Sequence, residues 1–132
     1  MYKFDVIKIQ EICGYQSFYK LIINGKCEFD EFCESMMKVD KTKKILRKIY
    51  ARLETIAQLK QTQLSSHKFG QLKRPKNDPY PDYEIKEKEY RLYFFKDKGS
   101  GKIIVFGGKK KNQKKDIERL RKIKKAYLNY KT

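Results

Sequence analysis

The chain of 132 residues carries 33 lysines and arginines against 16 aspartates and glutamates, a formal net charge of +17. Hydrophobic residues make up 39% of the sequence and aromatic residues 14%, which suffices for one core and argues against a disordered basic chain. No apolar run approaches the roughly 18 residues of a membrane-spanning helix, and the first residues lack the apolar core of a signal peptide. We therefore expect one soluble, cytoplasmic domain over residues 1–132 without a membrane partner.

The excess of positive charge points to an anionic partner. Like charges on one small domain repel each other unless a ligand of opposite charge relieves them. Nucleic acid is the expected ligand, because lysine and arginine neutralise its phosphates and release counterions. A membrane surface is the alternative.

The three cysteines, Cys13, Cys27 and Cys33, form no CxxC pair. Their odd number and their spacing argue against a disulfide framework and against a zinc site. We expect structural thiols, no metal and no cofactor.

Two β-type segments open the chain. Residues 4–12 (FDVIKIQEI) combine partial alternation with β-branched residues, which predicts a strand. Residues 18–23 precede the turn signal Asn24-Gly25. They either pair with the first strand as a hairpin or form an irregular lead-in to the next element.

Two helices are expected next. Apolar residues from position 29 recur at the spacing of one helical face, and a second stripe spans about residues 42–59. We interpret these stripes as core, and the basic residues of the second helix project away from it. The first stripe is Phe29, Phe32, Cys33, Met36 and Met37; the second is Ile45, Leu46, Ile49, Leu53 and Ile56.

The second half predicts three strands and a helix. All three prolines fall in the polar connection 60–82, which marks an exposed loop. Strands are expected over residues 82–86, 90–95 and 102–106, and short turns between them predict an antiparallel meander. Gly107-Gly108 is expected to end the last strand, and Asn112 to cap a helix that runs to about residue 129.

The predicted fold class is therefore α+β. We expect a small antiparallel sheet of three or four strands, with two N-terminal helices and one C-terminal helix packed on it.

The order of these segments resembles the RelE/HigB-like toxins of type II toxin–antitoxin systems, most closely the phage-derived HigB-like branch. The likeness rests on YEIK and YRLYFF, a turn, KIIVFGG, the stretch KKKNQKK and a closing helix, and it covers residues 66–128. It implies a RelE/ParE-like fold and an mRNA interferase that inhibits translation, an endoribonuclease acting on mRNA in the ribosome. It also implies a cognate antitoxin as partner.

Metal-free RNA cleavage needs a base for the 2′-OH, cations for the phosphorane and an acid for the leaving 5′-oxygen. Arg91 matches the position of the arginine with which the family grips a phosphate. A planar, permanently charged guanidinium suits phosphate binding. Lys86 matches a catalytic lysine of the family. Glu84 replaces a second lysine used by some members, and His67 is the lone histidine, so the identity of the base stays open among Lys86, Glu84 and His67.

A basic run follows the last strand. Residues 109–125 contain ten basic and two acidic residues, which favours contacts with the phosphate backbone. By resemblance, Lys109 and Lys110 are candidate catalytic residues. The candidate RNA-binding residues are Lys88, Lys111, Lys114, Lys115 and, for stacking against a base, Tyr93.

Two other functions fit the same sequence. A ParE-like toxin would use the same fold against a protein target such as DNA gyrase. A non-catalytic module that binds RNA or the ribosome would need only the charge.

Overall fold

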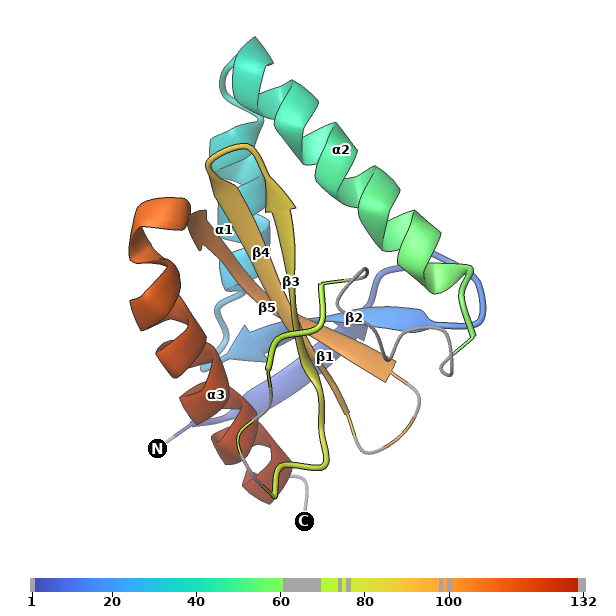
Figure 1. Ribbon diagram of the computed structural model, residues 1–132, viewed down its shortest axis with the longest axis vertical. Coiled ribbons are helices and arrows are strands. Elements are labelled where there is room, and N and C mark those ends of the chain that lie inside the picture. The colour runs from blue at the N-terminus through green and yellow to red at the C-terminus, as the bar shows by residue number, and fades with distance from the viewer. Residues whose placement is uncertain are drawn as a thin grey trace.

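The computed structural model describes residues 2–60, 70–73, 75, 77–97, 99 and 101–130, and Figure 1 traces them. Within these residues the fold is α+β, as the sequence predicts. His67 lies outside the described residues. The elements are β1 (Phe4–Lys8), β2 (Ser17–Ile23), α1 (Glu28–Met36), α2 (Asp40–Ala57), β3 (Asp82–Glu87), β4 (Tyr90–Lys96), β5 (Gly101–Lys109), the 3-10 turn η3 (Lys110–Asn112) and α3 (Gln113–Tyr130).

The sheet differs from the prediction in strand number and direction. The described residues form a sheet of five strands, in the order β1-β2-β5-β4-β3. All neighbours are antiparallel except β2 and β5, which run parallel. The expectation of three or four purely antiparallel strands was wrong, because the β2–β5 pairing joins residues about 80 positions apart and leaves no local signal.

The first two strands form the antiparallel pair that the sequence left open. Phe4 lies opposite Ile23 and Lys8 opposite Tyr19. β1 ends at Lys8, shorter than predicted, although Ile9 is still buried in the core.

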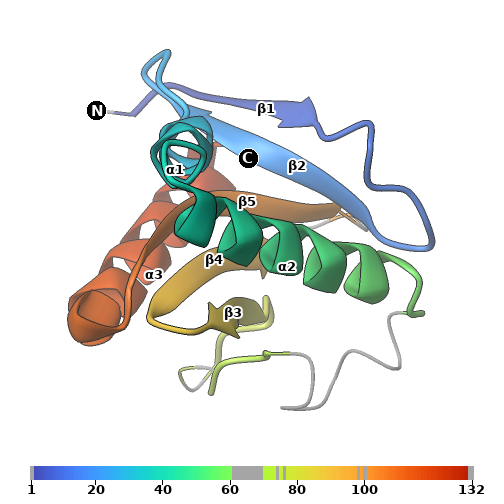
Figure 2. The same cartoon turned by 90° about the horizontal axis from the view of Figure 1, so that it is seen from above.

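Helices cover both faces of the sheet, as Figures 1 and 2 show. α1 and α2 follow the β1–β2 pair and pack on one face, where their stripes contact Phe18, Leu92 and Phe94. α3 packs on the opposite face, where Leu120, Ile123 and Tyr127 meet Tyr93 and Phe95. The prediction of two N-terminal helices was wrong in this respect: the strands β1 and β2 precede α1 and α2, and the three helices lie on both faces of the sheet. No helix among the described residues is long and apolar enough to cross a membrane.

β5 is longer than predicted, whereas α3 has the predicted bounds to within one residue. Gly107 and Gly108 lie inside β5, which ends at Lys109. A Cβ at Gly107 would lie 2.4 Å from the Phe32 ring, so glycine there allows α1 to approach the strand. The α-helix begins at Gln113, directly after Asn112 as predicted, and the 3-10 turn η3 precedes it from Lys110.

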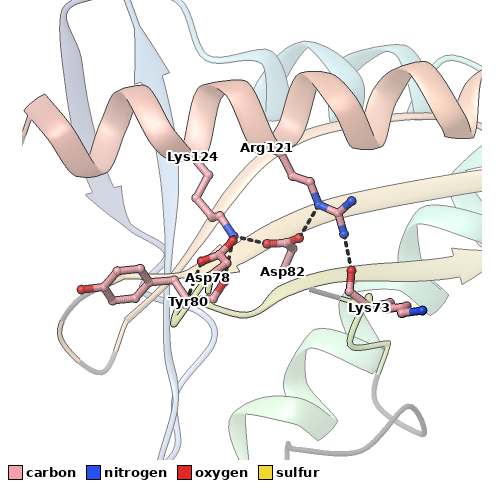
Figure 3. Close-up of polar contacts among 6 residues, drawn as sticks. All are labelled: Lys73, Asp78, Tyr80, Asp82, Arg121 and Lys124. Carbon is pink, nitrogen blue, oxygen red and sulfur yellow. Dashed lines mark hydrogen bonds and ion pairs between the residues drawn. The ribbon is translucent and has the colours of Figure 1, made fainter. Parts of the chain in front are cut away.

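A buried charge network holds α3 against the segment before β3 (Figure 3). The Lys124 ammonium is 4% exposed and pairs with the carboxylates of Asp82 and Asp78. Asp82, fully buried, also accepts a hydrogen bond from Arg121 Nε at 2.9 Å. Arg121 donates in addition to the carbonyl oxygen of Lys73. Because every charge has a partner, burial of the network is tolerated.

A second buried lysine lies on the α2 side of the sheet. Lys102, near the start of β5, is 0% exposed and donates to Gln16 Oε1 at 2.7 Å. Gln16 in turn donates to the carbonyl oxygen of Leu59, just after α2. Burial lowers the pKa of Lys102 to about 8, and the positive charge of Lys96 makes a smaller contribution in the same direction.

Replacing Lys124 with methionine should lower the free energy of unfolding by about 3 kcal/mol, because Asp82 loses a partner while remaining buried. Urea denaturation followed by circular dichroism measures the change. The matched control Lys122→Met, at an exposed position of α3, should stay within about 0.5 kcal/mol of the wild type. Equal stability of Lys124→Met and the wild type would contradict a stabilising role for the network.

Lys102 should make folding more favourable as the pH rises from 8 to 10. In that interval the unfolded chain keeps a proton on this lysine that the folded chain releases, so raising the pH favours the folded state. The free energy of unfolding of the wild type minus that of Lys102→Met should increase by on the order of 2 kcal/mol over this interval. The subtraction removes the tyrosine and cysteine titrations common to both proteins. A difference independent of pH would rule out this titration.

Candidate nucleic-acid interface

Lysines from three elements gather around one groove. They come from the N-terminal half of α2, the β3–β4 turn and the corner between β5 and α3. The groove comprises two adjoining hollows, of about 790 and 400 Å³, that share Glu89. We call it the lysine groove; its charged lining is Lys41, Lys44, Lys48, Lys88, Glu89, Lys109, Lys110 and Lys111.

The amphipathic pattern of α2 supplies one wall. Its apolar stripe, including Ile45 and Ile49, is buried against the sheet. Lys41, Lys44 and Lys48 recur every three or four residues, so they lie on one side of the helix next to that stripe. Ile45 forms the apolar base of the larger hollow.

The β3–β4 turn supplies the middle of the groove. It contains only Lys88 and Glu89, because Glu87 pairs with Tyr90 across the hairpin. Lys88 has φ of +56°, in the left-handed region that such tight turns require. The backbone N–H of Lys110 donates to the carbonyl oxygen of Glu89 at 2.7 Å, which joins the turn to the β5 corner.

The corner supplies the other wall. Lys109 lies opposite Tyr90 in the β4–β5 pair, and its ammonium lies 5.8 Å from the centre of the Tyr90 ring. That ring contacts Phe32, 6.4 Å between centroids, so Lys109 lies on the α1–α2 side of the sheet. Lys110 and Lys111 are exposed in η3. Seven lysines thus face one described acid, an arrangement that attracts phosphate.

Arg91 lies on the other side of the sheet. It is 5% exposed, and its Nη1 donates to the carbonyl oxygens of Lys88 at 2.9 Å and Tyr90 at 2.8 Å. Its Nε has no hydrogen-bond partner among the described residues. The guanidinium therefore holds the β3–β4 turn from beneath and is not presented to solvent.

Lys86 and Glu84 share the Arg91 side of the sheet. Lys86 lies opposite Arg91 in the β3–β4 pair and its side chain is 63% exposed. Its ammonium is 3.5 Å from the carboxylate of Glu84, which is 4% exposed. Both oxygens of Glu84 also accept from Gln113 Nε2 at 2.9 Å. Glu84 is thus engaged with the start of α3.

Tyr93 is buried beside this cluster and offers no ring face to a base. Its exposure is 0%, and its hydroxyl has no hydrogen-bond partner among the described residues. Burial, with the nearby charges of Glu84 and Asp116, raises the pKa of the Tyr93 hydroxyl. Burial likewise raises the pKa of Asp116.

The structure therefore separates the candidate site residues into two groups. Lys88, Lys109, Lys110 and Lys111 meet in the lysine groove. Arg91 and Tyr93 are buried on the opposite side of the sheet. Lys86 is paired with Arg91 but lies exposed on the edge strand β3, where it also borders a pocket against α2. Lys114 and Lys115 are exposed in the first turn of α3, after the corner that joins the two regions.

Sequence reasoning did not assign the lysines of α2 to the site. Their spacing of three and four residues was a usable signal, since it places all three on one helical side. What the sequence did not contain was the neighbour of that side, which is the β3–β4 turn.

Comparison with known proteins identifies no relative: no family model, no curated protein and no solved structure matches the chain.

Proposed function

We propose that this protein binds the phosphate backbone of RNA in the lysine groove and acts as a RelE/HigB-like toxin on messenger RNA. The observation that carries the binding step is the convergence of seven lysines and one acid from three elements on one groove. Exposed lysines bind phosphate with little dependence on sequence and with strong dependence on salt. Such binding suits an enzyme that acts on many messages.

The toxin assignment rests on the resemblance and on the order of elements. A strand pair, two helices, three antiparallel strands and a closing basic helix occur in the expected succession. The partners that follow are a cognate antitoxin, with an acidic or amphipathic segment that covers the groove, and the ribosome that carries the message. A short acidic or helix-turn-helix reading frame beside the gene would support the toxin assignment.

Cleavage would use groups at the rim of the molecule. Lysine ammonium groups stabilise the charge of a phosphorane, and the 2′-OH needs a base within hydrogen-bond reach. Lys86 is exposed and has the Glu84 carboxylate beside it. The exposed lysines of the corner, including Lys109 and Lys110, would bind other phosphates of the same strand in the lysine groove.

A second candidate, RNA or ribosome binding without cleavage, is favoured by one specific observation. Arg91 and Tyr93 are both buried, so neither reaches a strand lying in the lysine groove. Binding alone would still inhibit translation by occupying the site of a ribosomal ligand.

Replacing Lys44 and Lys48 together with alanine should weaken binding of a single-stranded RNA about tenfold or more. Two lost phosphate contacts should also reduce the slope of log K against log salt by roughly 1.4. Fluorescence anisotropy of a labelled RNA, titrated at several KCl concentrations, measures both quantities.

The control for this pair is Lys3→Ala with Lys8→Ala. Both lysines are exposed at or next to β1, which lies at the sheet edge opposite β3, and the net charge changes equally. This control should bind as the wild type does. Equal losses in the two double variants would show that total charge, and not the groove, determines binding.

Lys86→Ala should abolish growth arrest and the appearance of 2′,3′-cyclic phosphate ends in a ribosome-programmed cleavage assay. The residue is exposed, so loss of activity would not reflect unfolding. Arg91→Lys, checked for folding by circular dichroism, should reduce cleavage as well. Wild-type protein that binds RNA but never cleaves it, with or without ribosomes, would exclude the nuclease and favour the second candidate.

A further inference from the structure

A separate pocket of about 620 Å³ lies beyond the lysine groove, between the C-terminal half of α2, the edge of β3 and the segment 70–73. We call it the β3-edge pocket. Its apolar lining includes Ile56, Leu72 and Ile85, and its described charged lining is Arg52, Lys73, Lys86 and Glu84. Arg52, Lys73 and Lys86 are exposed, whereas Ile56 and Ile85 are buried. The pocket therefore has an apolar floor and a cationic rim.

The β3-edge pocket continues the line of the lysine groove. Lys48 borders the groove and Arg52, one helical turn later on the same side of α2, borders the pocket. On the facing wall, Lys88 belongs to the groove and Lys86 to the pocket. Lys44 and Ile56 are twelve residues apart on α2, which corresponds to about 18 Å along the helix.

Segment 70–72 pairs with the edge of β3 beside the pocket, through an antiparallel bridge between Gln71 and Tyr83. Gly70 accepts a backbone hydrogen bond from Glu84 at 2.8 Å, and Leu72 donates one to Asp82 at 2.8 Å. A Cβ at Gly70 would lie 2.1 Å from the carbonyl oxygen of Glu84, and its φ is +85°. The segment 70–72 thus stays pressed against β3 and forms a fixed wall of the pocket.

A single nucleic-acid strand has the same alternation of charge and apolar surface as these two sites. Its phosphates require cations, and its unstacked bases bury flat apolar faces on protein surfaces. We propose that the β3-edge pocket receives one unpaired base of the RNA whose phosphates lie in the lysine groove. This inference rests on the proposed function and specifies the state of its ligand: single-stranded, with one base turned out.

Charge favours a nucleotide over an apolar peptide as the occupant. The described lining holds three cations against one carboxylate, and that carboxylate, Glu84, already accepts from Gln113 and lies beside Lys86. Arg52 also pairs with Glu87 at 2.9 Å, at a position outside the pocket lining. A neutral apolar segment would fill the floor but bring no anion to the exposed cations of the rim. A nucleotide fills the floor with its base and neutralises the rim with its phosphate.

Thr55→Trp tests the proposal by filling the pocket from its wall. Thr55 is exposed, lines the pocket, and carries no charge, so the substitution adds bulk without altering phosphate attraction. The probes are a labelled ten-nucleotide RNA and the same ribose-phosphate chain without bases. Gln10→Trp adds a similar bulk at an exposed position between β1 and β2 and serves as the control.

We expect the wild type and Gln10→Trp to bind the RNA about tenfold more tightly than the abasic chain. Thr55→Trp should bind both probes alike, at the abasic affinity of the wild type. If Thr55→Trp binds RNA as tightly as the wild type, or if the wild type does not distinguish the probes, the pocket takes no base. The Lys44/Lys48 variant separates the two claims, because its loss of binding together with an unaffected Thr55→Trp overturns only the pocket. A wild type that binds neither probe overturns both.

Discussion

The backbone pairing of β4 with both of its neighbours is the constraint on which the lysine groove depends. Pairing with β3 leaves a turn of two residues, Lys88 and Glu89. Pairing with β5 sets Tyr90 opposite Lys109, so the end of β5 arrives beside the same turn. The hydrogen bond from Lys110 to Glu89 then joins the corner to the turn. A shift of this register by one residue would move Lys109 to the other face of the sheet.

Buried and exposed charges are stabilised differently in this fold. Inside, Lys124 and Arg121 are surrounded by carboxylates and backbone carbonyls, because a buried charge without a partner is costly. At the groove, the lysines are exposed to water, where their repulsion is weakened by the high dielectric constant. Such a surface is compatible with folding and still retains a field that attracts an anion.

Local patterns predicted most elements but not their assembly. The helical stripes of α1 and α2 and the three strands from residue 82 follow from apolar spacing and turn residues, which act over a few positions. The β2–β5 pairing and the placement of α3 opposite α1 and α2 depend on contacts between distant segments. The candidate site divides in the same way: the lysines after β5 were identified from a contiguous run, whereas those of α2 needed the fold to become neighbours of the turn.

Arg91 supports the lysine groove without lining it, because it holds the β3–β4 turn. The sequence placed Arg91 early in a central strand, and the resemblance implied that it binds a phosphate, but its guanidinium donates to the carbonyl oxygens of Lys88 and Tyr90. Those carbonyls flank the turn that presents Lys88 and Glu89 to the groove. Removing Arg91 would release the turn from beneath and disturb RNA binding even if no phosphate ever touched the arginine. Loss of activity on its mutation therefore does not identify a catalytic role. The exposed Lys86 makes no such backbone contact in the described residues, so it can be replaced without releasing the turn.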